Sequence, residues 1–389
     1  MNDAGVGVDY GAIKARAVER ARSLGASAVR VTDAFADAAS RARMRDAFAR
    51  GDFATWGYDD TYASRASDPG EILPGARSVV CLAVPYATRY ATRRDVRRGR
   101  VSNYAWSADY HHRVRAMLAD VASVIDAAAG APVTAIACDT RPLAERAFAA
   151  RAGVGWIGKH TNLIAPGSGS FVFLGEIVTT LALPRDEPLK KNCGSCARCV
   201  DACPTRALRG DYTIDASRCI ADLTQRRDAI PREMRSLIGT WVWGCDLCQI
   251  VCPPTQRAGT VEDGASRPLD GNLAEPDLVS LLGLGSGEFK RRYAKTAMGW
   301  RGAAVLRRNA AVALGNAGDR STVSALARAL ERDPHPMVRA HVAWALGRIG
   351  SPSALTALQR RDDVEEDPSV REEIRAALLD GGLGVCRTR

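Results

Sequence analysis

The chain has 389 residues, of which 46% are hydrophobic, and this is enough to bury the cores of two or three domains. The sequence has no apolar run of about 18 residues or more. It also has no basic-then-apolar N-terminal signal, so we expect neither a membrane span nor export, and we expect the protein in the cytoplasm. The net charge of +10 favours an anionic partner such as a nucleic acid, although a solvated basic surface is the simpler explanation.

The first 185 residues or so alternate between helical and strand-like patterns, which predicts a mixed α/β domain. Pro184 and Pro188, with their charged flanks, mark its end. Helices are expected over Tyr10–Leu24, Tyr110–Ala129 and Pro142–Ala152, and strands over Ser78–Val84, Val133–Cys138 and Phe171–Leu183.

Two polar residues of this domain are candidates for chemistry. Asp139 lies between a predicted strand and a predicted helix, where a carboxylate can face a pocket and donate a proton if burial raises its pKa. A turn or N-cap role is the alternative, and the local pattern favours it. His111 either contacts a substrate or cofactor or simply lies at a helix start. It is not expected to bind cobalt, because Val114 replaces the glycine of the D-x-H-x-x-G motif.

Three glycines, Gly153, Gly155 and Gly158, match the dinucleotide-binding pattern G-x-G-x-x-G. That fingerprint requires a strand before it and a helix after it, whereas here a helix precedes and a strand-like run, residues 161–164, follows. A nicotinamide domain is therefore not expected. The loop could instead let a flat cofactor approach the backbone, since glycine has no side chain.

Eight of the eleven cysteines lie between Cys193 and Cys252, and in a long chain without an export signal this indicates metal sites. The first run has the C-x2-C-x2-C-x3-C-P spacing of bacterial ferredoxins, whose fourth cysteine binds the neighbouring cluster. The second run lacks its first cysteine because Val242 stands there, and Cys219 can replace it. The three remaining cysteines, Cys81, Cys138 and Cys386, are expected to be inert buried thiols.

Eight cysteines supply four ligands to each of two [4Fe–4S] clusters, with no cysteine of this region left over. A zinc site is the alternative, but zinc prefers paired knuckles over triple runs that end in Cys-Pro. The first ligand set is Cys193, Cys196, Cys199 and Cys252, and the second set is Cys203, Cys219, Cys245 and Cys248.

The C-terminal part repeats itself every 32 residues, with Arg307, Arg339 and Arg371 at equivalent positions. Each unit can hold two short helices, which resembles HEAT-like repeats stacked into a small solenoid. The basic residues Arg307, Arg308, Arg339 and Arg348 favour a surface for RNA, and a purely structural cap is the alternative.

These patterns predict an α+β fold with three domains. A mixed α/β catalytic domain is expected over residues 1–186 and a ferredoxin-like domain with two clusters over residues 187–262. A C-terminal α-helical domain of HEAT-like repeats is expected over residues 271–389.

The order of several segments resembles the epoxyqueuosine reductase family, and the resemblance covers nearly all of residues 10–380. The family implies cobalamin as a further cofactor, an external electron donor, and the reduction of epoxyqueuosine to queuosine at the wobble position of certain tRNAs. No motif demands a dimer, so a monomer is expected. The segments that carry the resemblance are Asp109-Tyr110-His111, residues 139–145, residues 152–159, residues 173–176, both cysteine runs and residues 243–246.

The resemblance also assigns roles to single residues. The eight cysteines keep the ligand roles given above, and Asp139 matches the proposed proton donor. The expected cobalamin contacts are Arg65, Ser102, Asp139, Lys159, His160 and Thr161. Two other functions stay open: a related corrinoid reductase of the reductive dehalogenase kind, acting on a small molecule, and an electron-transfer ferredoxin with a docking tail.

Overall fold

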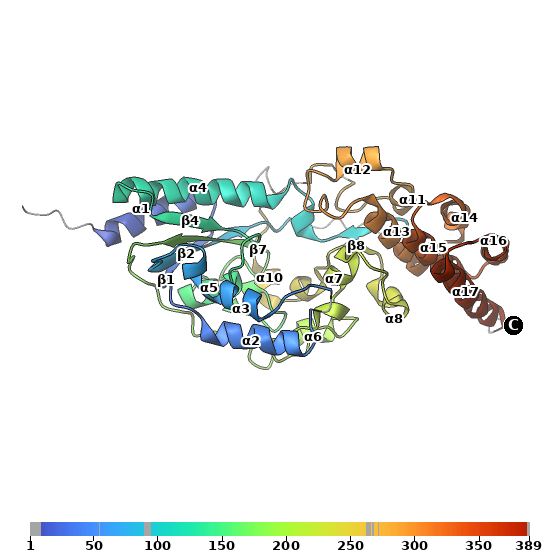
Figure 1. Cartoon of the computed structure of the whole chain (residues 1–389), viewed down its shortest axis with the longest axis horizontal. Coiled ribbons are helices and arrows are strands. Elements are labelled where there is room, and N and C mark those ends of the chain that lie inside the picture. The colour runs from blue at the N-terminus through green and yellow to red at the C-terminus, as the bar shows by residue number, and fades with distance from the viewer. Residues whose placement is uncertain are drawn as a thin grey trace, which may run out of the picture. The chain divides into compact units, whose positions relative to one another are not determined.

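The computed structural model describes residues 9–53, 55–88, 95–261, 266, 268–270 and 272–386 (Figure 1). By its internal contacts the chain forms two compact units, each assembled from segments that are distant in the sequence. The first comprises Met1–Ala87, Asp109–Ser217 and Leu247–Val261, and the second comprises Thr88–Ala108, Arg218–Asp246 and Glu262–Arg389. Within the described ranges, no helix has both the length and the apolar character that crossing a membrane requires. The three domain boundaries expected from the sequence stay a prediction.

The first unit is built on a four-stranded antiparallel sheet with the order β1-β2-β7-β4. Strand β2 pairs on both sides, and nearly all its residues are buried, as an apolar run of this length predicts. The three strands expected from the sequence are present: β4 and β7 are shorter than predicted, β2 is one residue longer, and β1 adds a fourth. The bounds are β1 Ala28–Asp33, β2 Ser78–Pro85, β4 Thr134–Ala137 and β7 Val172–Thr179.

Helices cover both faces of this sheet (Figure 1). Helices α1 (Tyr10–Ser23) and α4 (Tyr110–Ala129) pack together on one face, and α5 (Glu145–Ala152) packs on the other with contacts to β1, β2 and β7. Both long helices match their predicted bounds to within one residue. The further helices of this unit are α2 Ala38–Ala49, α3 Asp60–Ser67, α6 Arg198–Asp201, α9 Leu247–Ile250 and α10 Pro253–Arg257.

Helix α5 begins at Glu145, three residues later than the predicted start at Pro142. The preceding segment is held as a loop because the Ala144 N–H donates to the Ala66 carbonyl at 2.7 Å. The Asp139 N–H donates to a carboxylate oxygen of Glu145. Both backbone N–H groups are therefore engaged outside the helix. These two hydrogen bonds hold the turn that carries Asp139 in a non-helical conformation.

The glycine-rich loop enters an antiparallel hairpin of β5 (Trp156–Ile157) and β6 (Leu163–Ile164), which confirms that it is not a dinucleotide fingerprint. A Cβ atom on Gly153 would lie 2.2 Å from the Glu187 carbonyl oxygen, and one on Gly155 would lie 2.4 Å from that of Ile164. The chain's own backbone therefore occupies the space beside both glycines. The expectation that glycine opens this face to a flat cofactor is wrong at these two positions.

The second unit contains the predicted helical repeats. Two helix pairs and a final helix follow one another at the expected period: α13 Ala303–Ala317, α14 Val323–Arg332, α15 Pro336–Ile349, α16 Pro352–Asp362 and α17 Pro368–Cys386. Gly315 and Gly347 occupy equivalent positions, and a Cβ on either would lie within 3 Å of the next inner helix, at Ala345 or Ala377. The repeated glycine thus allows α13, α15 and α17 to pack closely.

Shorter elements complete the second unit. Strands β3 (Arg100–Val101) and β8 (Trp241–Trp243) form a small parallel pair. The remaining helices are α7 Ile220–Gln225, α8 Arg232–Arg235, α11 Leu278–Leu282 and α12 Ser286–Arg292. Single 3-10 turns in the chain cover Pro69–Glu71, Asn103–Ala105, Ala216–Arg218, Ser236–Ile238 and Arg320–Thr322.

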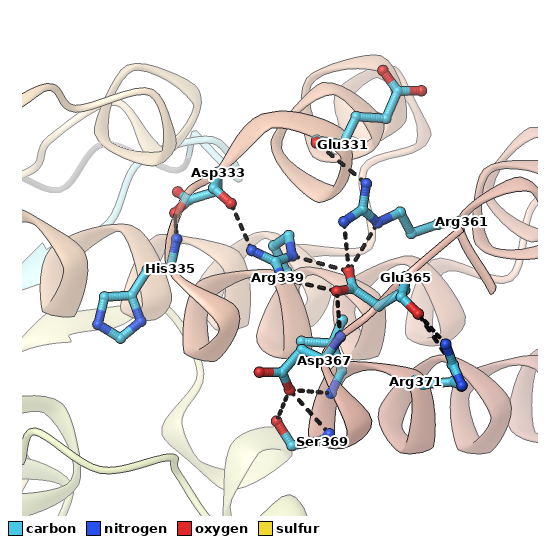
Figure 2. A network of polar contacts seen from close by, with 10 residues as sticks. Glu331, Asp333, His335, Arg339, Arg361, Glu365, Asp367, Ser369 and Arg371 are labelled. Carbon is cyan, nitrogen blue, oxygen red and sulfur yellow. Dashed lines mark hydrogen bonds and ion pairs between the residues drawn. The ribbon is translucent and has the colours of Figure 1, made fainter. Parts of the chain in front are cut away.

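The repeated arginines bind carboxylates inside the solenoid, as Figure 2 shows for Arg339. Arg339 donates to both Glu365 oxygens at 3.0 and 2.8 Å, and Arg307 donates to both Asp333 oxygens at 2.6 and 3.1 Å. Arg371 donates to the Glu365 carbonyl. The expectation that Arg307 and Arg339 serve an RNA surface is therefore wrong, because both guanidinium groups are engaged within the repeats.

Arg308, another of the predicted RNA-facing residues, is completely buried. It donates to the carbonyl oxygens of Leu223, Arg226 and Asp228 at 2.6 to 3.0 Å. The neighbouring Asn309 donates to the carbonyls of Thr224 and Val242. Helix α13 therefore holds the loops between residues 218 and 246 through buried hydrogen bonds, so the repeats are part of the support of that segment.

Substitution of Glu365 by Gln tests the solenoid network. Glu365 is 1% exposed and accepts hydrogen bonds from Arg339, Arg361 and the Asp367 N–H, which lower its pKa to about 2. We expect Glu365→Gln to lower the midpoint of thermal unfolding by several degrees, at roughly 2–4 °C per kcal/mol lost. Circular dichroism measures it.

The adjacent Glu366 is exposed, which makes Glu366→Gln the matched control with an unchanged midpoint. Because the folded-state pKa of Glu365 lies below its unfolded value, its contribution is complete above about pH 4.5 and is lost as the pH falls towards 2. The difference between the unfolding midpoints of Glu365→Gln and Glu366→Gln should therefore become smaller as the pH is lowered. Equal midpoints for both variants at neutral pH would contradict this role of Glu365.

Candidate active site and cluster site

Asp139 lies two residues after β4 with an exposed side chain and a left-handed backbone, φ 54°. The Tyr110 hydroxyl donates to its Oδ2 at 3.2 Å, and His111 Nε2 lies 3.0 Å from the same oxygen. The other ring nitrogen of His111 lies 2.6 Å from Asp109 Oδ1. Asp109 also caps α4, so the helix start positions Tyr110 and His111 over the strand end. An unusual backbone conformation at an accessible carboxylate is typical of a functional site.

The contact between Asp139 and His111 shifts the pKa of both side chains. The hydrogen bond with His111 lowers the pKa of Asp139, and this outweighs the opposing effect of burial. The same bond raises the pKa of His111, with a further contribution from Asp109. An imidazole between two carboxylates donates through both nitrogens when it is protonated. A proton donor at Asp139 was expected to have a raised pKa, but with its carboxylate exposed to water the pKa of Asp139 is lowered.

Two buried carboxyl groups lie next to this pair. Glu176 on β7 is 0% exposed, and burial together with the neighbouring Glu145 raises its pKa well above the usual range. Burial also raises the pKa of Glu145 to about 7. Since two adjacent buried carboxylates repel each other, the pair holds a proton at neutral pH. Glu145 is also the acceptor of the Asp139 N–H, so it positions the loop as well.

Aromatic rings flank Asp139. Tyr58 and Tyr62 stack with their ring centroids 4.2 Å apart, and the Asp139 charge contributes to the raised pKa of each phenol. Burial is the largest cause, and it raises the pKa of Tyr62 to about 12. The ring of Tyr110, whose hydroxyl donates to Asp139, stacks on Phe173 with the ring centroids 4.2 Å apart. The carboxylate thus lies among flat apolar faces of the kind on which nucleobases stack.

The first predicted cysteine set gathers around one cavity of about 180 Å³. Its lining includes Cys193, Cys196, Cys199 and Cys252, together with Trp156 and His160. Burial raises the pKa of Cys199 and of Cys252, and Cys193 raises both further, which places these thiols near one another. All these residues belong to the first unit.

The unpaired polar groups of this cavity fit an anionic, acceptor-rich group. Trp156 Nε1 and His160 Nε2 are both buried, and neither has a hydrogen-bond partner among the residues that the structure describes. The Lys159 N–H donates to Cys193 Sγ at 3.4 Å. Four thiolates and two free N–H donors suit a [4Fe–4S] cluster, whose sulfur atoms accept hydrogen bonds. Over the described ranges, no three His, Cys, Asp or Glu side chains converge as they would on a single metal ion.

The second predicted cysteine set draws on both units. Cys203 and Cys248 belong to the first, and Cys219 and Cys245 belong to the second. Cys219 precedes α7, and the carbonyls of this short helix accept hydrogen bonds from Arg308 and Asn309. This set stays a prediction. It implies that removal of the repeats would also remove the residues that support the loop after Cys219.

The residues expected to contact cobalamin have varied surroundings. Arg65 is exposed on α3, and Ser102 is buried in the second unit with its hydroxyl donating to Asp246 at 2.7 Å. Lys159 Nζ donates to the Gly194 carbonyl, and His160 lines the cysteine cavity. Thr161 has a left-handed backbone, φ 65°. They do not form one pocket in the first unit, so the cobalamin contacts stay a prediction.

Glu145 and Glu176 are functional candidates that were not predicted from the sequence. Both lie in segments that carry the family resemblance, but a single carboxylate in a strand or at a helix start shows no sign of a partner. Their pairing arises only when β7 and α5 pack against each other. The stacking of Tyr58 on Tyr62 was likewise not predicted, although a Y-x3-Y spacing is compatible with it.

Comparison with known proteins gives matches over most of the chain. The family model for a 4Fe-4S double cluster binding domain matches residues 192–255, and the model for HEAT repeats matches residues 301–379. The model described as epoxyqueuosine reductase QueG, DUF1730, matches residues 66–140. These matches confirm the predicted fold class, with its double-cluster and HEAT-like parts.

Individual relatives agree with the family models. An epoxyqueuosine reductase of Lactococcus garvieae is 38% identical over 72% of this chain and 80% of the relative. One of Xanthomonas campestris is 38% identical over 77% and 86%. The crystal structure of an epoxyqueuosine reductase with an epoxyqueuosine-modified tRNA-Tyr stem loop superposes with a TM-score of 0.89. It is 31% identical and covers 96% of this chain and all of the other.

The ligand sets predict an iron content of about eight atoms per chain, because each of two cubanes holds four. We expect Cys252→Ser and Cys219→Ala each to lose about half of the iron, each from a different cluster. Iron analysis and electron paramagnetic resonance of the reduced protein measure this. The buried Cys81 supplies the control, and Cys81→Ser should keep both clusters. Two unchanged spectra in Cys219→Ala would contradict the second set.

Proposed function

The chain belongs to the epoxyqueuosine reductase family, and we propose that it reduces epoxyqueuosine to queuosine at the wobble position of a tRNA anticodon loop. The observation that carries the proposal is the match, over nearly the whole of both chains, to an enzyme bound to the modified stem loop. The alternative of a corrinoid reductase acting on a small molecule has no support of this kind.

The reaction converts an epoxide to an alkene and water and consumes two electrons and two protons. Two [4Fe–4S] clusters, when bound, supply single-electron transfer, and cobalamin supplies a strongly reducing cobalt centre. The chain itself must hold these groups, exclude water and deliver protons. The departing oxygen is far too basic to leave as an alkoxide at neutral pH, so one proton must be given by a positioned acid.

Asp139 is the proposed acid, and its contact with His111 explains how an ionised carboxylate can serve. The raised pKa of His111 and the lowered pKa of Asp139 favour the ionic form of the pair while Asp139 is exposed to water. A bound nucleotide covers the carboxylate, and desolvation disfavours both charges, so the proton moves from His111 towards Asp139 Oδ2. Substrate binding thereby creates the acid at the place where it is used.

Glu145 and Glu176 have two proposed roles behind this pair. Glu145 holds the Asp139 N–H and so keeps the loop in its left-handed conformation. The buried pair also keeps one proton in the immediate surroundings at neutral pH, because its members cannot both ionise. The first unit can thus hold both protons that the reaction consumes, one on the Asp139–His111 pair and one on the Glu145–Glu176 pair.

The remaining features of the function are proposals as well. The ligand set Cys193, Cys196, Cys199 and Cys252 holds one cluster, and Cys203, Cys219, Cys245 and Cys248 hold the other. An external donor supplies the electrons, the chain acts as a monomer, and a tRNA substrate is consistent with a cytoplasmic protein.

Anaerobic incubation with cobalamin, a reductant and epoxyqueuosine-containing tRNA, followed by nucleoside mass analysis, tests the activity. Absence of queuosine with all cofactors bound would contradict it.

Asp139→Asn separates the chemical role of this residue from its structural one. Asn tolerates the left-handed backbone and can accept the same hydrogen bonds, so the fold and both clusters should remain. It cannot donate an acidic proton, and we expect turnover to fall by roughly 10²–10⁴-fold. Single-turnover conversion of the modified tRNA measures this. Near-normal turnover would return Asp139 to the role of a turn residue.

The pH dependence supplies a second measurement. His111 has a raised pKa, so its imidazolium persists above the usual range and is lost as the pH rises through the folded-state value. We expect turnover to fall on that alkaline side. The amide introduced by Asp139→Asn would accept the hydrogen bond from His111 without the negative charge that stabilises the imidazolium, so NMR titration of this variant should show the pKa of His111 moving down. The exposed His112 provides the internal reference.

Binding of tRNA should weaken steeply with salt, because arginines replace counterions on phosphates. Of the four repeat arginines singled out from the sequence, Arg348 has an exposed side chain. We expect Arg348→Ala to lower the affinity and to reduce the slope of log K against log salt by about one. Arg20, which is paired with Asp120, gives the control Arg20→Ala. Equal slopes for both variants would show that Arg348 makes no phosphate contact.

A further inference from the structure

His160 has an environment unlike that of an ordinary core histidine. It lies in the turn between β5 and β6, is 2% exposed, and lines the cavity that the four thiols of the first set surround. The adjacent Lys159 N–H donates to Cys193 Sγ, so this turn lies directly against the cluster site.

The hydrogen bonds of the ring define its tautomer. The Asn162 N–H donates to His160 Nδ1 at 3.2 Å, so Nδ1 must be an unprotonated acceptor. The neutral ring then carries its proton on Nε2. That N–H is buried and has no acceptor in the parts of the chain that the structure describes. A buried donor of this kind destabilises a protein unless a bound group accepts from it.

The protein makes room for this ring at the expense of a side chain. A Cβ on Gly158 would lie 2.9 Å from His160 Cε1 and 3.1 Å from Nε2. It would also lie 2.8 Å from Ile164 Cδ1, so the imidazole and the Ile164 side chain together favour glycine at position 158. The ring thus packs closely against the backbone at residue 158, beside the cavity that the thiols line.

We propose that His160 donates a hydrogen bond from Nε2 to a sulfur of the [4Fe–4S] cluster held by Cys193, Cys196, Cys199 and Cys252, and thereby raises its reduction potential. This inference rests on the first ligand set proposed above. It replaces the expectation that His160 contacts cobalamin. His160 acts through the cluster and is a positioning residue with an electrostatic effect on electron transfer.

The physical reason is charge. Reduction adds one electron to a cluster that already carries four thiolates, and an N–H dipole directed at its sulfur stabilises the added negative charge. Removal of the donor makes the reduced form less favourable. The second cluster does not share this donor, so the spacing between the two potentials changes and the electron transfer between the clusters changes with it.

The test is a redox titration of the two-cluster protein with dithionite, followed by electron paramagnetic resonance. We expect His160→Phe to disfavour reduction of one cluster about tenfold, which is a negative shift of about 59 mV for one electron. The other midpoint should not move. His160→Gln retains an N–H near the position of Nε2 and should keep most of the wild-type value. The exposed His335 gives the control His335→Phe, with both midpoints unchanged.

A measurement on the wild-type protein guards against loss of the cluster in a variant. With ¹⁵N-labelled histidine and exchange into D₂O, electron–nuclear double resonance should detect an exchangeable deuteron and one weakly coupled ring nitrogen at the reduced cluster. Absence of both couplings, or an unmoved midpoint in His160→Phe with both clusters present, would overturn the proposal. Neither readout uses tRNA or turnover. Failure of the proposed function would appear in the nucleoside analysis, and failure of the ligand set in the iron content and spectra of the cysteine variants.

Discussion

The buried guanidinium of Arg308 sets the constraint on which the second unit depends. A fully buried cation is tolerated only when its donors are satisfied, and here backbone carbonyls of residues 223–228 and the side chain of Asn309 accept from it. Burial lowers its pKa to about 9, which still leaves it charged at neutral pH. Because these carbonyls belong to the segment between Cys219 and Cys245, the helical repeats and these two proposed ligands of the second cluster share one framework.

The active-site region of the first unit follows a different principle. Its key groups are few and are fixed by the ends of regular elements: Asp109 by the start of α4, Asp139 by the end of β4 and Glu145 by the start of α5. Helices α4 and α5 each have a buried apolar face, and β4 ends at the buried Ala137, so the charged residues at these ends have little freedom. Charges that lie close together at such ends shift one another's pKa, which is raised for His111 and lowered for Asp139.

Much of this arrangement could be predicted from the sequence, because periodicity and ligand spacing are local signals. The long helices, the central strands, the 32-residue repeats and the cysteines of the first set needed no knowledge of tertiary contacts. The partners of Arg307, Arg308 and Arg339 did need it. An arginine on a helix has the same sequence signal whether it faces RNA or a buried carboxylate. The pairing of Glu145 with Glu176 was hidden for the same reason, since the two residues meet only after β7 and α5 pack.

The interleaved composition of the first unit bears on how the protein is made. Its last segment, Leu247–Val261, carries Cys248 and Cys252. During synthesis, at about 5–20 residues per second, the first three cysteines of the first set leave the ribosome about 3–10 seconds before the fourth. During that interval the nascent unit holds an incomplete set of the proposed ligands. Insertion of a finished cluster is expected after translation has passed residue 261. The cluster would then cross-link segments of the first unit that are distant in the sequence.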